Sequence, residues 1–131
     1  MLEKFSRKIL IVEDDMTIST LYRIKFEKEG YIVKVSNNGM DAVANVMEFS
    51  PDVILLDIMM PGMDGFEILR VIRELAPSLK TKIIMFSNLN RQSDIDRCLQ
   101  NGADGYLLKA DNTPADAVNK IEEMFSNSQM R

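Results

Sequence analysis

The sequence predicts an α/β domain built around a parallel sheet. Runs of consecutive apolar residues alternate five times with segments whose apolar residues recur at helical spacing. This alternation is typical of βαβ units, in which the connecting helices cover both faces of the strands. With 131 residues, the chain has the length of a single domain.

Five apolar runs are the candidate strands, at about residues 8–12, 31–36, 52–57, 82–87 and 105–109. The run Val53-Ile54-Leu55-Leu56 is the clearest, because four apolar residues in succession leave no polar face for solvent. It ends in Asp57, and a Pro61-Gly62 turn follows.

Five amphipathic segments are the candidate helices, at about 15–29, 39–48, 65–75, 91–101 and from Thr113 onward. The residues expected to face the core are Ile18, Leu21, Tyr22 and Phe26; Ala42, Val43, Val46 and Met47; Phe66, Leu69 and Ile72; Ile95, Cys98 and Leu99; and Ala117, Val118, Ile121 and Phe125. Asp15, Asp64 and Thr113 are the expected N-caps. Outside a core at about 8–125, we expect a short arm at 1–7 and a frayed tail at 126–131.

Polar side chains follow four of the five predicted strands. Glu13 and Asp14 follow the first, Asp57 ends the third, and Ser87 and Lys109 end the fourth and fifth. The carboxyl ends of parallel strands lie along one edge, which is where open α/β sheets bind their ligands. Each residue alone would be an ordinary turn residue or solvated lysine, but their joint placement predicts one site.

This set of residue types suggests phosphoryl chemistry. Three carboxylates in a small space repel one another and raise their pKa values, which a hard divalent cation relieves. All-oxygen ligation suits Mg²⁺, with Mn²⁺ as the alternative. A cation, the Lys109 amine and the Ser87 hydroxyl would stabilise a phosphoryl group in transfer, and Asp57 would be its nucleophile.

Composition excludes several other classes of protein. The chain has 16 Lys and Arg against 20 Asp and Glu, so no basic surface for direct nucleic-acid binding is expected. Its single cysteine fits a reducing compartment. There is neither a long apolar span nor a signal-peptide pattern, so we expect a cytoplasmic protein without a membrane segment. Without histidine, the chain cannot form a phosphohistidine of its own.

From about Lys8 to Phe125, the sequence resembles the receiver domains of two-component response regulators. The resemblance includes the acidic pair Glu13-Asp14, Asp57, the turn Met60-Pro61-Gly62-Met63-Asp64-Gly65, Ser87, Tyr106 and Lys109. It implies a flavodoxin-like, doubly wound sheet of five parallel strands in the order 2-1-3-4-5, with five helices.

The resemblance also implies a role for each residue. Asp57 would be the phosphoacceptor and Lys109 the phosphate-binding lysine. Ser87 and Tyr106 would be the switch hydroxyl and the switch aromatic. The Mg²⁺ ligands would be Glu13, Asp14, Asp57 and the backbone carbonyl of Met59.

The partners implied by this resemblance are proteins. A sensor histidine kinase or a histidine phosphotransfer protein would donate the phosphoryl group to Asp57. A downstream protein would then bind the face made by helix four, strand five and helix five. That face carries few basic residues, with Asn119 and Lys120 as a weak basis for pairing, so we expect a monomer.

The sequence departs from the family pattern in three ways. The family lysine is usually followed by a cis proline, but here Ala110 follows Lys109, so we expect a trans peptide there. The residue after the switch hydroxyl is usually small in the family, whereas here it is Asn88. Met59 and Leu89 are apolar where the family often has polar side chains, which predicts slow loss of the phosphoryl group.

Three alternatives to a stand-alone receiver remain open. The chain could be a receiver cut from a longer regulator, or a degenerate receiver that serves only as a binding scaffold. It could also be a Mg²⁺-dependent phosphohydrolase that uses an aspartate. Phosphatases of that kind place a second aspartate two residues after the nucleophile, and Met59 at that place argues against turnover.

Overall fold

The structure, a computed structural model, describes residues 6–75 and 80–129. Its strands are β1 (Lys8–Val12), β2 (Ile32–Ser36), β3 (Val53–Asp57), β4 (Lys82–Ser87) and β5 (Gly105–Leu108). Its helices are α1 (Met16–Lys28), α2 (Gly39–Phe49), α3 (Gly65–Leu75), α4 (Gln92–Gln100) and α5 (Pro114–Gln129), with a 3-10 turn, η1 (Lys109–Asp111), between β5 and α5.

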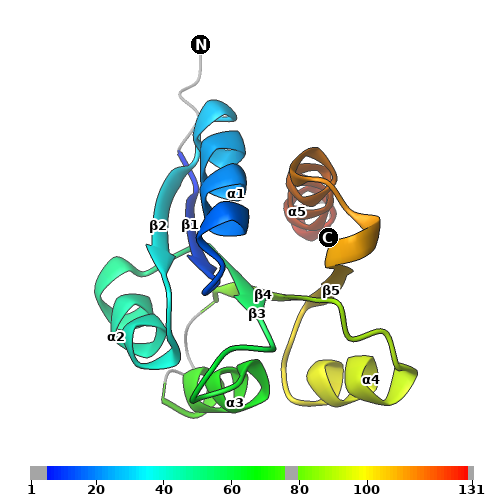
Figure 1. Ribbon diagram of the computed structural model, residues 1–131. Helices are drawn as coiled ribbons and strands as arrows, with labels where there is room; N and C mark the ends of the chain where they lie inside the picture. Colours follow the sequence, from blue (N-terminus) through cyan, green and yellow to red (C-terminus); the bar gives the residue numbers. More distant parts are fainter. Residues whose placement is uncertain (1–5, 76–79, 130–131) are drawn as a thin grey trace.

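The five strands form one parallel sheet in the order β2-β1-β3-β4-β5 (Figure 1). The predicted flavodoxin-like topology is therefore confirmed. β1 and β3 are neighbours, with Val12 beside Leu56, so the residues that follow these strands emerge side by side.

Two separate apolar clusters lie on the two faces of the sheet. Alternate residues of each central strand point to opposite faces, as the pleat requires. One cluster contains Leu10, Val12, Ile54, Leu56, Ile83 and Met85 under α2, α3 and α4. The other contains Ile9, Ile11, Val53, Leu55, Ile84 and Phe86 under α1 and α5. Both faces of the sheet are therefore covered, with α1 and α5 together on one of them (Figure 1).

Three residues predicted to be buried are exposed. Leu21 of α1 and Met47 of α2 are each 55% exposed, and Leu99 of α4 is 46% exposed. Each lies next in sequence to a residue that is buried: Tyr22, Val46 or Cys98. The helices contact the sheet through stripes narrower than the apolar pattern suggests, so only one residue of each adjacent pair reaches the core.

The predicted helix starts are confirmed. The Asp15 carboxylate accepts hydrogen bonds from the amides of Thr17 and Ile18, at 2.9 and 3.1 Å. Asp64 accepts one from Glu67 N at 3.0 Å. At the start of α5, Thr113 Oγ1 accepts from Asp116 N and Asp116 Oδ2 accepts from Thr113 N, at 3.1 and 2.8 Å. This reciprocal pair satisfies two amides that the helix itself cannot.

The two ends of the last βα unit differ from the prediction. β5 ends at Leu108, and Lys109 begins η1 instead of ending the strand. The Lys109–Ala110 peptide is trans, as predicted. α5 continues to Gln129, into the segment for which a frayed tail is predicted.

Met1–Phe5 of the predicted arm, and Met130 and Arg131, lie outside the described residues. Across the described ranges, none of the helices has the length and apolar character needed to cross a membrane.

Candidate functional site

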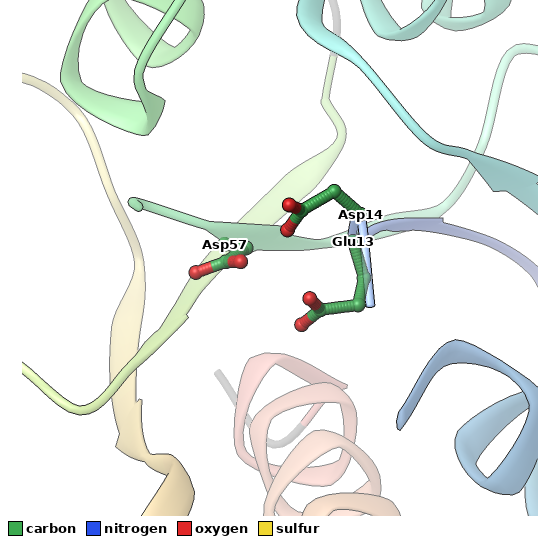
Figure 2. A group of neighbouring side chains, drawn as sticks. All are labelled: Glu13, Asp14 and Asp57. Atoms are coloured by element: carbon green, nitrogen blue, oxygen red, sulfur yellow. The ribbon is translucent and has the colours of Figure 1, made fainter. Parts of the chain in front are cut away.

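Three carboxylates meet at the carboxyl ends of β1 and β3. Figure 2 shows the side chains of Glu13, Asp14 and Asp57 next to one another at this edge. Each offers one oxygen, and these oxygens lie within 4.8 Å of one another. The pairing of β1 with β3 produces this arrangement, because Glu13 directly follows Val12 and Asp57 directly follows Leu56. The predicted acidic cluster is therefore present.

Two of the three carboxylates are inside the protein. Glu13 is 1% exposed and Asp57 is 2% exposed, whereas Asp14 is open to solvent. One oxygen of each buried group accepts a backbone hydrogen bond: Glu13 Oε2 from Asp15 N at 3.0 Å, and Asp57 Oδ1 from Met59 N at 3.1 Å. These bonds hold the side chains in place and leave their other oxygens directed into the site.

Lys109 lies between the two buried carboxylates. Its Nζ is 2.7 Å from Glu13 Oε1 and 3.2 Å from Asp57 Oδ2. Nζ is also 5.1 Å from the centroid of the Phe86 ring, whose face attracts a cation. The sequence prediction that a fifth-strand lysine reaches Asp57 is confirmed, although Lys109 lies just beyond the strand.

Burial and the contacts with Lys109 have opposite effects on the pKa values of the site residues. It raises the pKa of both Glu13 and Asp57, and the neighbouring Lys109 opposes this increase. Burial alone would lower the pKa of Lys109, but its contacts with Glu13 and Asp57 outweigh that effect and raise it. The Lys109 ammonium thus pairs with two buried carboxylates. The exposed Asp14 adds a third negative charge beside them.

The donor set fits a small hard cation. Glu13 Oε1 is buried without a hydrogen bond of good geometry, although Lys109 Nζ is close to it. Carboxylate oxygens, some buried and one solvent-exposed, are ligands that Mg²⁺ accepts while keeping several waters. Glu13, Asp14 and Asp57 could hold such an ion. The Met59 carbonyl remains a predicted ligand, since only the Met59 amide is placed by its hydrogen bond to Asp57.

Ser87 and Tyr106, the predicted switch residues, both bond to the backbone of Leu89. Ser87 ends β4, is 1% exposed, and its Oγ accepts a hydrogen bond from Leu89 N at 3.2 Å. Tyr106 of β5 donates its hydroxyl to Leu89 O at 2.7 Å. Burial raises the pKa of Tyr106, so its hydroxyl remains a donor. Leu89 therefore connects the two side chains through its main chain.

The two apolar residues predicted beside the site, Met59 and Leu89, line one shallow pocket of about 480 Å³. Ile58, Met60, Asp64 and Phe66 complete its wall. Met59 is 61% exposed, so it covers the rim without filling the interior. Asn88 is exposed as well.

Sequence reasoning missed two contributors to the site. Asn37 donates its Nδ2 to Glu13 O at 3.2 Å and so fixes the chain just after β1. It directly follows β2, so the search for polar residues at strand ends that found Asp57 could have found it. The bonds of Leu89 are made by its backbone, and no residue type signals them.

The sequence matches the family described as Response regulator receiver domain over residues 9–122. That range includes every residue of the acidic cluster, Lys109 and the two predicted switch residues. The chain belongs to this family.

Other receiver proteins share both the sequence and the fold of this receiver domain. It is 36% identical to the transcriptional regulatory protein ResD of Bacillus subtilis (strain 168) over 118 residues. This aligned segment covers 90% of this chain and 48% of ResD. The chain thus spans about half the length of that relative. A CheY-like receiver domain protein from Methanospirillum hungatei JF-1 superposes with a TM-score of 0.86 at 29% identity, over 96% of this chain and 98% of the other. Chemotaxis protein CheY4 of Vibrio cholerae gives a TM-score of 0.84 at 26% identity, over 91% and 98%.

Proposed function

We propose that this receiver domain accepts a phosphoryl group on Asp57 in a reaction that requires Mg²⁺. The observation that supports this best is the position of Asp57. Its carboxylate is buried at a strand end, 3.2 Å from an ammonium and within 4.8 Å of two further carboxylates. A structural aspartate needs neither a lysine nor an acidic cluster around it, whereas a phosphoacceptor needs both.

The chain's own residues divide the chemistry between them. A carboxylate oxygen of Asp57 forms the new bond to phosphorus as the donor's bond to phosphorus breaks, and the leaving group takes up a proton. Lys109 Nζ and the Ser87 hydroxyl are donors for the oxygens of the phosphoryl group. The Met59 amide holds Asp57 in position through its hydrogen bond to Oδ1. Mg²⁺, when held by Glu13, Asp14 and Asp57, supplies positive charge that offsets the carboxylates and the incoming phosphoryl group.

The proposed partners follow from this role. The donor is a sensor histidine kinase or a histidine phosphotransfer protein. The phosphohistidine must come from another protein, because this chain contains no histidine. Leu89 bonds to both Ser87 and Tyr106, so a change at Ser87 would reach β5. The output is a protein that binds the face of α4, β5 and α5. The domain does not turn over substrate, because Met59 stands where a phosphatase would have its acid-base aspartate.

Acetyl phosphate with Mg²⁺ tests this function, with intact mass as the readout. We expect the mass of one phosphoryl group to be added and retained for longer than the measurement takes. Continuous release of phosphate with no retained mass would favour the phosphohydrolase. No added mass, with or without Mg²⁺, would favour a binding scaffold.

We expect the Asp14→Asn variant to bind Mg²⁺ at least tenfold more weakly and to be more stable without metal. Removing one of three charges within 4.8 Å relieves about 1 kcal/mol of repulsion at an exposed position. The melting temperature without metal should rise by roughly 3–6 °C, and adding Mg²⁺ should raise it less than in the wild type. Asp96→Asn, which removes the same charge from α4, is the control and should change neither property. An unchanged Mg²⁺ affinity for Asp14→Asn would contradict this ligand set.

The double variant Met59→Asn, Leu89→Glu is expected to lose its phosphoryl group at least tenfold faster than the wild type. Both wild-type side chains are apolar and line the pocket beside the site, so neither can orient an attacking water. Polar groups at both positions could do so, and each ~1.4 kcal/mol taken from the barrier is tenfold in rate. Loss of the added mass over time measures this.

The control for this experiment is Met47→Asn, because Met47 is about as exposed as Met59 but lies on α2. It should leave the lifetime unchanged. If the double variant is no faster than the wild type, shielding by Met59 and Leu89 does not set the lifetime.

A further inference from the structure

The loop between β5 and α5 must hold Lys109 in place without the proline that usually follows this lysine. Lys109 begins the η1 turn, and its peptide bond to Ala110 is trans. No proline occurs between Lys109 and Thr113 to restrict the backbone. The 2.7 and 3.2 Å contacts of Nζ therefore require another source of rigidity in the loop.

Asn112, the residue after η1, closes this loop on itself. Its Nδ2 donates to Leu108 O at 2.9 Å, so a side chain four residues on bonds back to the last residue of β5. Leu108 and Asn112 enclose the turn that begins with Lys109. The Asn112 side chain thus restrains both ends of the segment that carries the lysine.

The same residue is also attached to α1. The Tyr22 hydroxyl donates to the backbone carbonyl of Asn112 at 3.3 Å. Tyr22 is 6% exposed, and burial raises its pKa, so the hydroxyl keeps its proton. At 3.3 Å this hydrogen bond is long, so its contribution should be smaller than that of the Asn112 side chain.

Packing connects this attachment to the lysine itself. The ring of Tyr22 contacts that of Phe86, with centroids 4.8 Å apart, and the Phe86 ring is 5.1 Å from Lys109 Nζ. Phe86 is also the residue of β4 that pairs with Asp57 of β3. Tyr22 therefore contacts both the loop that carries Lys109 and the aromatic ring over which its ammonium lies.

We propose that Asn112 is a positioning residue for Lys109, helped by Tyr22, and that it takes over the task of the missing proline. The inference rests on the proposed function, because it assumes that Lys109 assists phosphoryl transfer to Asp57. Asn112 itself does not touch the reacting atoms. It acts by holding the turn so that Nζ remains directed at Asp57.

The first test compares single variants in acetyl phosphate reactions followed by intact mass. Asn112→Ala should lower the second-order rate constant about tenfold, and Tyr22→Phe should lower it less. Asn119→Ala is the matched control, because it removes the same side chain from an exposed position seven residues further on. Mg²⁺ affinity should stay within twofold of the wild type in all three, since the proposed ligands lie at the ends of β1 and β3.

The second test separates positioning from general damage to the fold. Asn112→Ala is repeated in a Lys109→Ala background, with long incubations at high acetyl phosphate so that slow rates are measurable. If Asn112 acts through Lys109, its substitution should change the rate less than twofold there. An equal tenfold loss in both backgrounds, or no loss in the wild-type background, would overturn the inference.

Failure of this inference can be told apart from failure of the proposed function. A wild type that gains no phosphoryl group contradicts the function itself. A wild type that gains one, with Asn112→Ala reacting equally fast, contradicts only the role of Asn112.

Discussion

The Asp57→Asn variant is expected to take up no phosphoryl group under conditions in which the wild type gains one. The side-chain amide of asparagine is a far weaker nucleophile than a carboxylate, so no acyl phosphate should form at this position. Among the described residues, Glu13 is the other carboxylate that is buried, lies at the end of a strand and contacts Lys109, and we assign it to the metal ion instead. Intact mass after acetyl phosphate treatment with Mg²⁺ measures the loss, which should be complete.

The variant should still fold, which makes the result interpretable. Asparagine has the shape of aspartate, and its side-chain oxygen can keep the hydrogen bond from Met59 N. The substitution also removes a buried charge whose pKa burial raises. Asp64→Asn is a matched control, because Asp64 is exposed and asparagine caps helices as well as aspartate does. Full labelling of Asp57→Asn would show that the acceptor is a different residue.

Gly65→Ala is expected to be the most destabilising single substitution near the site. A Cβ added at Gly65 would lie 2.5 Å from Ile58 Cα and 2.6 Å from Asp57 O, both backbone atoms that cannot move aside. The amide of Gly65 also donates to Ile58 O at 2.8 Å, so the start of α3 is held directly against the end of β3. We expect a loss of about 3 kcal/mol in the free energy of unfolding, measured in urea.

A different glycine separates this steric effect from backbone strain. Gly62 has a φ of 84°, but a Cβ there would meet nothing within 4 Å. Gly62→Ala should therefore cost only about 1 kcal/mol, from the unfavourable backbone conformation alone. Equal stability of the two variants would mean that the close contact of α3 with β3 relaxes easily. Gly65→Ala should also slow phosphorylation, because the displaced atoms include the backbone of Asp57.

The sheet could be predicted from its apolar runs, and most of the site could be predicted from the residues at the ends of those runs. The uninterrupted apolar runs mark strands buried on two faces, and the carboxyl ends of parallel strands share one edge. Glu13, Asp57, Ser87 and Lys109 are each the last residue of such a run or follow it. Helical periodicity was less informative, since Leu21, Met47 and Leu99 fit the apolar pattern but are exposed. The pattern gives the direction of a face, and the shape of the sheet decides how wide the contact is.

The parts that could not be predicted depend on the backbone or on distant pairs. Leu89 bonds to Ser87 and Tyr106 through main-chain atoms that every residue possesses. The bond between Tyr22 and Asn112 joins residues 90 positions apart, neither of which stands out in its own segment. The η1 turn begins at the last residue of a predicted strand, and the Asn112 side chain bonds back across this turn to Leu108 O.

The order of the site residues along the chain also affects how the protein is made. Glu13 and Asp14 are synthesised early and Asp57 midway, and Lys109 is added only after β5 is complete. Until then, the neighbouring acidic groups have no lysine partner to balance them. A chain released early, or cut before β5, therefore keeps the self-repelling carboxylates without their ammonium. Such a fragment should be unstable, and it lacks the lysine on which the proposed transfer of a phosphoryl group to Asp57 depends.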